Sequence, residues 1–421
     1  MANKNITHNV REHYENLPYP ERLPEDEKKR LLHTGLDSLD RMNHYCFKGQ
    51  QSFNENFRVL VAGGGTGDAI IYLAEQLRGK KARIVYLDLS SASMEIAKER
   101  ARIRKLDNIE WVNASILEQN SKSLGEFDYI NCSGVLHHLE DPLVGLKVLK
   151  NLLAPNGVLA IMVYAKYGRT AIYQTQELLR MVNSNATSSI QEEVNNAWKI
   201  LNSLPPTNWL KRSEGLHTDH ERYGDIGLYD LFLHKQDRAY SIPELFDWLN
   251  QADLNFIDFS CSKSDYDPRC YIKDQELLQS VLSKNKQEQY AISELISGAI
   301  IKHSFYCGKN KNTIADLTED SILVLSDSVN KNELSKVMVS ENTGNNYLFQ
   351  QSAIKISVDI DVLTCTFFSH LDRKHSIKEI SNIVVNSIPQ AQFSVGDVIT
   401  HLMSLSSVLI EIDKLYIVKR C

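Results

Sequence analysis

Hydrophobic residues in the first part of the chain come in short runs that alternate with amphipathic stretches. Five apolar runs have the length and composition of strands buried on both faces of a sheet: residues 59–62, 84–87, 109–112, 127–132 and 158–164. The stretches between them place apolar side chains at every third or fourth position, which predicts helices, for example over residues 92–106 and 142–153. Strands that alternate with helices predict a parallel, doubly wound (Rossmann-like) α/β sheet.

The pattern differs on both sides of this segment. Residues 1–50 begin as a polar stretch, in which Leu17-Pro18-Tyr19-Pro20 favours an extended strap, and residues 26–43 are predicted to be helical. This strap is either a plain cover over the core or a lid whose Tyr14 and Tyr19 face a ligand. Residues 166–250 form a mostly helical insertion at the carboxyl end of the fifth strand, where the ligand crevice of such a sheet lies.

The last segment, residues 310–421, is predicted to be a separate small α+β domain. Residues 360–371, 377–385 and 395–405 have helical periodicity, and residues 408–412 and 415–418 are expected to form a hairpin around Asp413-Lys414. Helices followed by a two-stranded wing are typical of a winged-helix module. The segment has no dense basic face, so dimerisation or substrate docking is favoured over DNA binding. Residues 51–309 are left as the central domain.

A glycine-rich turn joins the first strand to the helix that follows it. Strand, glycine turn and helix form the opening of a nucleotide site, because glycine lets a ligand approach the backbone. Asp88 ends the next strand about 20 residues later, where a carboxylate can bind the two hydroxyls of a ribose. A dinucleotide fingerprint needs glycine or alanine at the position of Asp68, whose carboxylate would repel a pyrophosphate. An adenosine cofactor without phosphate is therefore favoured over a nicotinamide.

Three motifs together indicate a family. Gly63, Gly65 and Gly67 fall on every second residue, Asp88 follows, and the run Gly-Val-Leu-His-His-Leu at residues 134–139 has Asp-Pro behind it. In this combination residues 9–308 resemble the bacterial class I S-adenosylmethionine-dependent methyltransferases. The resemblance implies a seven-stranded sheet, closed by residues 254–260 and an antiparallel strand at 300–307, and it implies S-adenosyl-L-methionine as the cofactor. It also implies that a lid over the cofactor is the better interpretation of the strap.

The resemblance and the loop chemistry give a set of candidate cofactor-binding residues: Tyr14, Tyr19, Ala62, Gly63, Gly64, Gly65, Gly67, Asp88, Leu89, Ser115, Ser133 and His137. The family often has an acid at the position of Val61, which contacts the cofactor's methionine part, and another at the position of Ser115, which contacts adenine. Both departures are expected to affect the affinity for the cofactor.

Methyl transfer from a sulfonium needs alignment of donor and acceptor, and a general base only when the acceptor is protonated. The candidate catalytic residues are His138 and Tyr164, at the ends of strands four and five, and His234 in the insertion. If residues 229–240 are helical, Asp230, His234 and Asp237 share one face and could orient or deprotonate the acceptor. The alternative for each histidine is ordinary packing. No metal is expected, because the adjacent His137 and His138 cannot share a helical face.

The composition limits the classes of partner that we expect for this protein. The 421 residues carry a net charge of −6, no apolar run approaches membrane-spanning length, and seven scattered cysteines suggest reduced thiols, so we expect a cytoplasmic protein without nucleic-acid or membrane partners. The acceptor is expected to be a protein or peptide, with lysine a candidate, or alternatively a small metabolite. A non-catalytic cofactor-binding regulatory protein is the third hypothesis, and a homodimer is left open.

Overall fold

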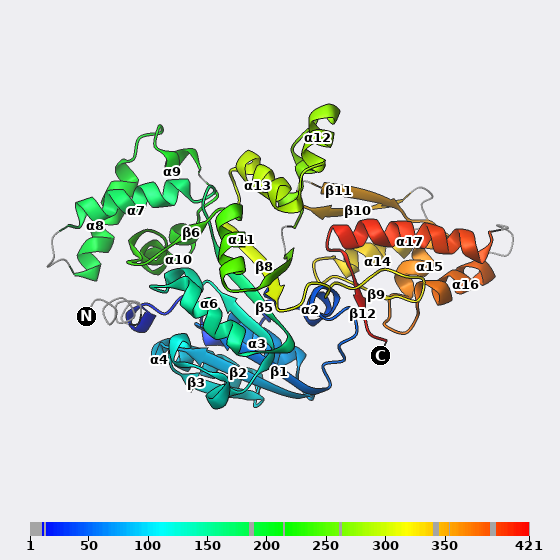
Figure 1. Cartoon of the computed structure of the whole chain (residues 1–421), viewed down its shortest axis with the longest axis horizontal. Helices are drawn as coiled ribbons and strands as arrows, with labels where there is room; N and C mark the ends of the chain where they lie inside the picture. Colours follow the sequence, from blue (N-terminus) through cyan, green and yellow to red (C-terminus); the bar gives the residue numbers. More distant parts are fainter. Residues whose placement is uncertain are drawn as a thin grey trace.

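A computed structural model of the chain describes residues 11, 14–184, 189–213, 215–260, 263–339, 345–352, 354–387 and 393–420. Its centre is one mixed sheet with the strand order β3-β2-β1-β4-β5-β8-β7, and the two-residue β6 pairs beside β5 (Figure 1). The strands are β1 Glu55–Ala62, β2 Lys81–Asp88, β3 Ile109–Asn113, β4 Phe127–Ser133, β5 Leu153–Ala165, β6 Ala239–Tyr240, β7 Asn255–Phe259 and β8 Lys302–Gly308. Strands β1 to β5 are parallel, and β8 runs antiparallel between β5 and β7. The predicted doubly wound sheet with an antiparallel last strand is confirmed.

Helices cover both faces of the sheet because alternate strand residues point to opposite sides. Val59 packs with α2 Leu39–Cys46, α3 Asp68–Gln76 and α4 Ser91–Arg104, whereas Leu60 packs with α6 Pro142–Asn151 and α11 Ile242–Gln251 on the other face. The remaining helices of this region are the four-residue α5 Ser121–Leu124, and α12 Gln275–Leu282 and α13 Lys286–Ser297 between β7 and β8. The apolar runs of the sequence thus become the buried centre of a three-layer structure.

The insertion after β5 is helical, as predicted, and has a core of its own. It contains α7 Thr170–Val182, α8 Ile190–Ser203, α9 Trp209–Arg212, α10 Asp219–Leu228 and a π-helical turn Tyr229–Leu233. Ile172, Val194 and Phe232 pack together inside it. In Figure 1 it lies above the sheet on the left, whereas α11 rests directly on the sheet, so the inserted part ends near residue 241 rather than 250.

The prediction of one helix over residues 26–43 is wrong. A 3-10 helix covers Pro24–Lys28 and α2 begins at Leu39, with an irregular loop between them. A tight turn interrupts the helix, because the Asp37 amide donates to the Thr34 carbonyl at 3.1 Å and the Thr34 hydroxyl donates to the Asp37 carboxylate at 2.6 Å. Residues 33–37 therefore become a loop at the edge of the sheet.

The C-terminal unit contains α14 Lys331–Val339, α15 Val362–Ser369, α16 Ile377–Ser387 and α17 Val395–Glu411, with two small sheets. The three predicted helices are present, but the hairpin prediction is wrong: residues 408–411 belong to α17, and β12 Leu415–Val418 pairs with β9 Ile322–Leu325. Leu409 continues the buried stripe of Val398 and Leu402 along α17. The apolar run at residues 408–411 is therefore the end of a buried helix, which a short apolar run cannot distinguish from a strand. The second ribbon, β10 Asn346–Gln351 with β11 Ile354–Asp359, precedes the three helices.

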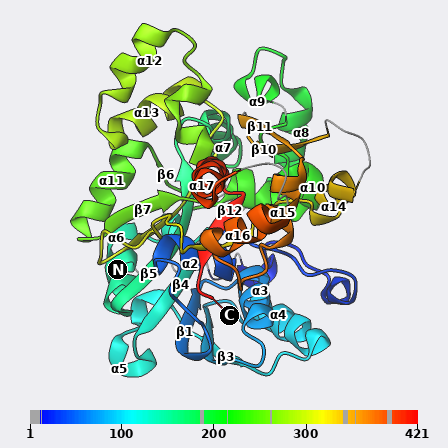
Figure 2. The same ribbon diagram turned by 90° about the vertical axis from the view of Figure 1, so that its right-hand side faces the viewer.

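Strands β9 and β12 belong to two cores at once. Leu323 and Ile417 face the helices of the C-terminal unit, whereas Val324, Tyr416 and Val418 pack into the core that lies under α2 and β1. The two views agree that β12 lies beside α2 (Figures 1 and 2). The C-terminal unit therefore shares buried apolar surface with the central domain.

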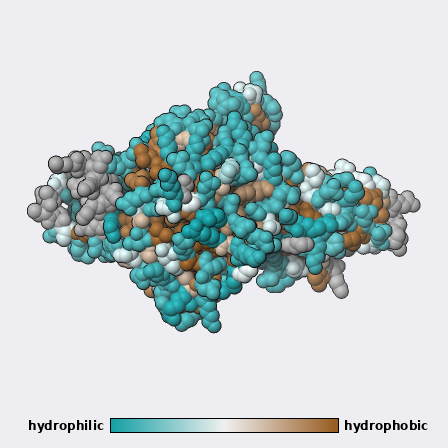
Figure 3. All heavy atoms as spheres, turned by 60° about the horizontal axis from the view of Figure 1, so that its bottom comes forward, coloured by the Kyte–Doolittle hydropathy of each residue, from teal (hydrophilic) through white to brown (hydrophobic). Residues whose placement is uncertain are grey.

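Figure 3 shows one face of the molecule, on which hydrophilic atoms predominate and hydrophobic atoms gather in separate patches. Among the helices in the described part of the chain, none is long and apolar enough to cross a membrane.

Candidate functional site

A cavity of about 640 Å³ lies at the carboxyl ends of β1, β2, β4 and β5. One wall is the glycine turn with the strand ends, and the other is the N-terminal strap with Arg169, α10 and the π-helical turn of the insertion. Most of the candidate residues from the sequence line it: Tyr14, Tyr19, Gly63, Gly64, Gly65, Gly67, Asp88, Leu89, Ser115, Ser133, His138 and Tyr164. Three candidates do not: Ala62 is buried inside β1, and His137 and His234 lie behind the wall.

The glycine turn needs glycine for two different reasons. Gly63, Gly65 and Gly67 have φ values of 76°, 50° and 105°, which side chains other than glycine rarely adopt. At Gly64 a Cβ would lie 2.2 Å from the ring of Tyr86, so the turn packs tightly on β2. At Gly65 a Cβ would meet only the Tyr19 carbonyl, at 3.1 Å, so this residue presents bare backbone to the cavity. The turn thus forms a cradle for a ligand that contacts main chain.

Asp88 stands beside this cradle. Its two carboxylate oxygens accept the amides of Gly65 and Ser90, each at 2.8 Å, which fixes the carboxylate at the end of β2. Burial raises the pKa of Asp88 from its ordinary value. The carboxylate lines the cavity and can also accept a hydrogen bond from a hydroxyl of a ribose. Leu89 and Ser115 extend the wall past it, which suits the flat, apolar ring of an adenine.

The N-terminal strap is fastened to the glycine turn and to α4. The Thr66 hydroxyl donates to the Pro20 carbonyl at 2.7 Å, and the Ser90 hydroxyl donates to the Tyr14 carbonyl at 3.0 Å. Asp68, the residue that argued against a pyrophosphate, pairs with Arg22 at 2.6 Å and with the buried Arg100 at 2.8 Å. Asp68 therefore anchors the strap, a role that its position in the sequence did not reveal.

The ring of His138 is the part of the histidine cluster that reaches the cavity. Its Nδ1 lies 2.7 Å from the Gln236 carbonyl, which can only accept, so Nδ1 carries the hydrogen and Nε2 keeps a lone pair. Burial lowers the pKa of His138, and that of His137 behind it, so both rings are neutral near pH 7. His137 packs against the Tyr164 ring, with ring centres 4.0 Å apart. The arrangement offers one basic nitrogen at the cavity wall.

The expected stripe on one helical face is wrong, although its members do come together. The π-helical turn ends at Leu233, and His234 has an extended ψ of 128°. Asp230 lines the cavity with the Tyr14 hydroxyl 3.4 Å from its carboxylate, and Asp237 instead pairs with Arg169 at 3.5 Å. His234 stacks on His138 with ring centres 3.9 Å apart, so it supports that ring from behind.

Arg169 is the cation of this region, and only 4% of it is exposed. Its guanidinium carbon lies 3.6 Å from the centre of the Tyr164 ring, a cation–π contact. Its Nε and Nη2 have no hydrogen-bond acceptor among the described residues, although Nη2 is near Asp237. Burial raises the pKa of the neighbouring Asp230 to about 7. Buried groups of opposite charge and four tyrosines (Tyr14, Tyr19, Tyr164, Tyr223) thus line this part of the cavity.

Several lining residues were missed by the sequence analysis. Asp37, Asn131 and Lys302 come from segments far apart in the chain, and Asp219 and Tyr223 come from α10. No local pattern marks them, because each reaches the cavity only through the packing of whole elements. Within the part of the chain that the structure describes, no three His, Cys, Asp or Glu side chains are placed to hold a metal ion.

Comparison with known proteins agrees with this geometry. Residues 60–159, which contain the glycine turn, Asp88 and the histidine run, match a family model described as a methyltransferase domain. The chain contains an S-adenosylmethionine-dependent methyltransferase domain. The domain is 33% identical over 115 residues to the tRNA 5-carboxymethoxyuridine methyltransferase of Escherichia coli, a match that covers 27% of this chain and 42% of that enzyme.

Two longer matches extend beyond the methyltransferase domain. The chain is 34% identical over 254 residues to the uncharacterized protein syc1184_c of Synechococcus sp., and the match covers 60% of each chain. It thus spans less than two thirds of the length of either relative. Its fold is similar to that of PKMT2 from Rickettsia typhi, with a TM-score of 0.65 over 91% of this chain and 76% of that one, at 17% identity. A second structure of PKMT2, in complex with AdoHcy, gives the same TM-score at 18% identity.

Proposed function

We propose that the protein transfers a methyl group from S-adenosylmethionine to an acceptor held beside Tyr164, Arg169 and Asp230. One observation carries this proposal: a single cavity joins the glycine turn and Asp88 to a buried polar cluster on its far side. A donor site and an acceptor site must share one space for an in-line transfer. The methyltransferase domain and the histidine run support the same conclusion.

The residues present fit the cofactor. The cradle at Gly65, where a Cβ would fill the space, the carboxylate of Asp88 and the apolar wall at Leu89 would hold the adenosine part. When bound, the cofactor supplies an electrophilic methyl group on a positively charged sulfur. Tyr14, Tyr19 and Tyr164 offer ring faces to that charge, and Tyr14 and Tyr19 arrive on the strap, which we propose acts as a lid.

The chain's own contribution to the transfer is to orient the acceptor and to take up its proton. His138 can accept a proton at Nε2, because the Gln236 carbonyl keeps the hydrogen on Nδ1. The stacked ring of His234 and the packed ring of His137 hold this imidazole in one orientation. On this view His138 is the catalytic residue of the cluster, and His234 is a positioning residue.

We infer that the acceptor is an amine carried by a protein or peptide, with a lysine side chain as the leading candidate. Asp230 supports this, since a buried carboxylate among tyrosines suits an ammonium group, and burial raises the pKa of Asp230 to about 7. The fold of the protein is also similar to that of PKMT2, a protein-lysine methyltransferase, over most of the chain.

A small metabolite with a carboxylate is the second candidate. It is favoured by Arg169, which lines the same cavity. Its Nε and Nη2 make no hydrogen bond to the described residues and could donate to a carboxylate of the acceptor. A non-catalytic protein that binds the cofactor and acts through its C-terminal unit is the third candidate.

The test begins with calorimetry of S-adenosylmethionine and S-adenosylhomocysteine binding to the full chain. Extract of the source organism with isotopically labelled cofactor then identifies the acceptor by mass spectrometry. Label on protein lysines supports the first candidate, and label on a small acid supports the second. Tight cofactor binding without any release of S-adenosylhomocysteine would instead support the regulatory hypothesis, and absence of binding would overturn the proposal.

A further inference from the structure

Asp37 is a buried carboxylate on the wall of the cavity with no role assigned to it above. It lies on the irregular loop of residues 33–37, every residue of which lines the cavity, and only 1% of Asp37 is exposed. Its Oδ1 accepts the Tyr129 hydroxyl at 2.9 Å and the Asn131 amide at 2.7 Å, and its Oδ2 accepts the Thr34 hydroxyl at 2.6 Å. Oδ2 therefore keeps a free lone pair, and the side chain has a fixed position.

The charge of Asp37 is not balanced by an ion pair in the described part of the chain. Among the described residues no lysine, arginine or histidine forms an ion pair with it, and its partners are a hydroxyl of threonine, a phenol and an amide. Burial accordingly raises the pKa of Asp37 to about 6. A carboxylate buried without a cation is costly unless a ligand supplies the missing charge. Val61, the β1 residue that pairs with Asn131, offers only an apolar side chain.

Asp37 and Asp88 line the same cavity beside different strands of the sheet. Asp88 ends β2, and Asp37 is bonded to Tyr129 and Asn131 on β4, so the two carboxylates lie on opposite sides of β1. S-adenosylmethionine has a ribose near its middle and a single ammonium on its amino-acid end. We propose that Asp37 binds the α-ammonium of the cofactor's amino-acid part. This inference rests on the proposed function and names the residue that completes the cofactor site.

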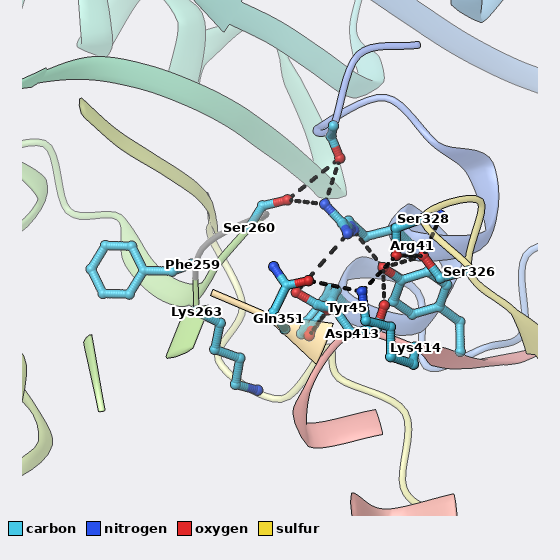
Figure 4. A network of polar contacts seen from close by, with 12 residues as sticks. Arg41, Tyr45, Phe259, Ser260, Lys263, Ser326, Ser328, Gln351, Asp413 and Lys414 are labelled. Carbon is cyan, nitrogen blue, oxygen red and sulfur yellow. Dashed lines mark hydrogen bonds and ion pairs between the residues drawn. The ribbon is translucent and has the colours of Figure 1, made fainter. Parts of the chain in front are cut away.

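The loop that carries Asp37 is held by the sheet and by the C-terminal unit. The Tyr306 hydroxyl donates to the Leu36 carbonyl at 2.6 Å. The Tyr129 oxygen lies 2.9 Å from both this carbonyl and Asp37 Oδ1, so its single hydrogen is shared between them. The Gly35 carbonyl accepts Nη1 of Arg41 at 2.9 Å, and Nε of Arg41 donates to the Tyr416 hydroxyl of β12 at 2.7 Å. Figure 4 shows Arg41 between Ser260 on one side and the turn at Asp413 on the other. Asp37 is thus positioned before any ligand binds, which lowers the entropic cost of binding.

The test compares two ligands that differ by the ammonium. Decarboxylated S-adenosylhomocysteine and methylthioadenosine are both thioethers with the same adenosine, but only the first carries an amine. At pH 8 the wild-type protein should bind the amine at least about tenfold more tightly in calorimetry, the scale of one charged hydrogen bond. Asp37→Asn should abolish this advantage and leave methylthioadenosine affinity within error. Asp88→Asn, the matched control, should weaken both ligands by the same factor, because both carry the ribose.

The second part of the test varies the pH and uses the wild-type protein. The tyrosines that face Asp37, Tyr129 from β4 and Tyr72 from α3, have pKa values raised by burial, so neither titrates between pH 5 and pH 8. Protonation of Asp37 should therefore cut the advantage of the amine up to about tenfold at pH 5, one unit below its pKa. An amine advantage that survives both Asp37→Asn and low pH would overturn the assignment. Failure of the wild-type protein to bind either ligand would overturn the proposed function as well.

Discussion

The two halves of the cavity are built by different means. For the adenosine part of the cofactor, the cofactor half uses backbone at Gly65 and one carboxylate at the end of a strand, all within residues 59–89. The acceptor half uses the side chains of Tyr14, Tyr164, Arg169 and Asp230, which meet only after three segments have packed together. The comparison shows that a site made from one strand–turn–helix unit is encoded locally, whereas a site made from buried charges depends on the whole fold.

The two halves of the cavity also differ in their effect on the stability of the folded protein. The glycine turn satisfies its polar groups through ordinary strand and turn hydrogen bonds, such as the Gly63 amide to the Leu87 carbonyl at 2.7 Å. The acceptor half buries the side chains of Arg169, Asp230 and Asp237, and such charges destabilise a fold unless they are paired. We therefore expect substitutions in the two halves to separate binding from stability.

The largest effect is expected from removing residues 310–421. If residues 310–421 were the separate domain that the sequence predicts, their removal would leave a folded protein, because the last strand of the sheet is expected to end at Cys307. The shared core argues otherwise: Tyr416 and Val418 are buried against the core under α2, and the Tyr45 hydroxyl donates to Asp413 at 2.6 Å. We expect an insoluble protein, or a Tm lower by more than about 10 °C, in calorimetric scans of the truncated chain. A truncated chain with an unchanged Tm would show that the unit is a separable domain.

The next largest effect is expected from a substitution that removes cofactor binding alone. Gly65→Val should reduce S-adenosylmethionine affinity by more than about 100-fold, because a β-branched side chain both disfavours the φ of 50° and fills the cradle. Gly79→Val is the matched control, since Gly79 has a φ of 74° with open space around it. Both variants should lose similar stability, and only Gly65→Val should lose binding in calorimetry. Equal affinities in the two variants would place the cofactor elsewhere.

A third substitution breaks the acceptor half without touching the cofactor. His138→Ala should keep cofactor affinity and lower kcat by about 10²–10⁴-fold for a protonated acceptor, the usual contribution of a general base. His234→Ala should lower kcat less, and His234→Phe should restore part of the loss, because a phenyl ring can keep the stack on His138. These rates are measured as S-adenosylhomocysteine release. A His138→Ala enzyme with wild-type kcat would leave the histidine cluster a packing feature.

The smallest expected effect is a change in stability when the buried carboxylate of the acceptor half, Asp230, is replaced. The folded pKa of Asp230 is raised from 3.8 to about 7, so its contribution to stability is lost as the pH rises through that window. Asp230→Asn should therefore be more stable than the wild type at pH 8, on the order of 2 kcal/mol, with a smaller difference at pH 4. The same variant should lower kcat/KM for an amine acceptor. Urea unfolding at the two pH values measures the first effect, and an Asn variant that is less stable at pH 8 would contradict it.

Much of the fold could be predicted because its signals are local. The strands of the sheet are continuous apolar runs, and the glycine turn and Asp88 follow two of them directly. The predictions that were wrong concern places where local signals were ambiguous. The apolar residues 408–411 suit a strand or a buried helix equally, and only the stripe through Leu402 and Leu409 decides for α17.

The less predictable residues owe their roles to distant partners. Asp37 reads as an ordinary polar residue inside an amphipathic stretch, and only its contacts with Tyr129 and Asn131, more than 90 residues away, bring it to the cavity. Asp68 was considered only for its repulsion of a pyrophosphate, and its bond to Arg22 depends on where the strap lies. The roles of the individual site residues stay predictions until binding and kinetics are measured.

The placement of β12 beside α2 has a consequence for the order in which the protein is made. A nascent chain released from the ribosome as far as Gly308 has every strand of the main sheet, yet Arg41 still lacks the Tyr416 hydroxyl, and Tyr45 lacks Asp413. The loop of residues 33–37 is translated early, but Arg41, which holds it, gains its hydrogen bond to Tyr416 only after residues 413–418 have been made. We expect a chain stalled before residue 413 to expose α2 to chaperones and proteases.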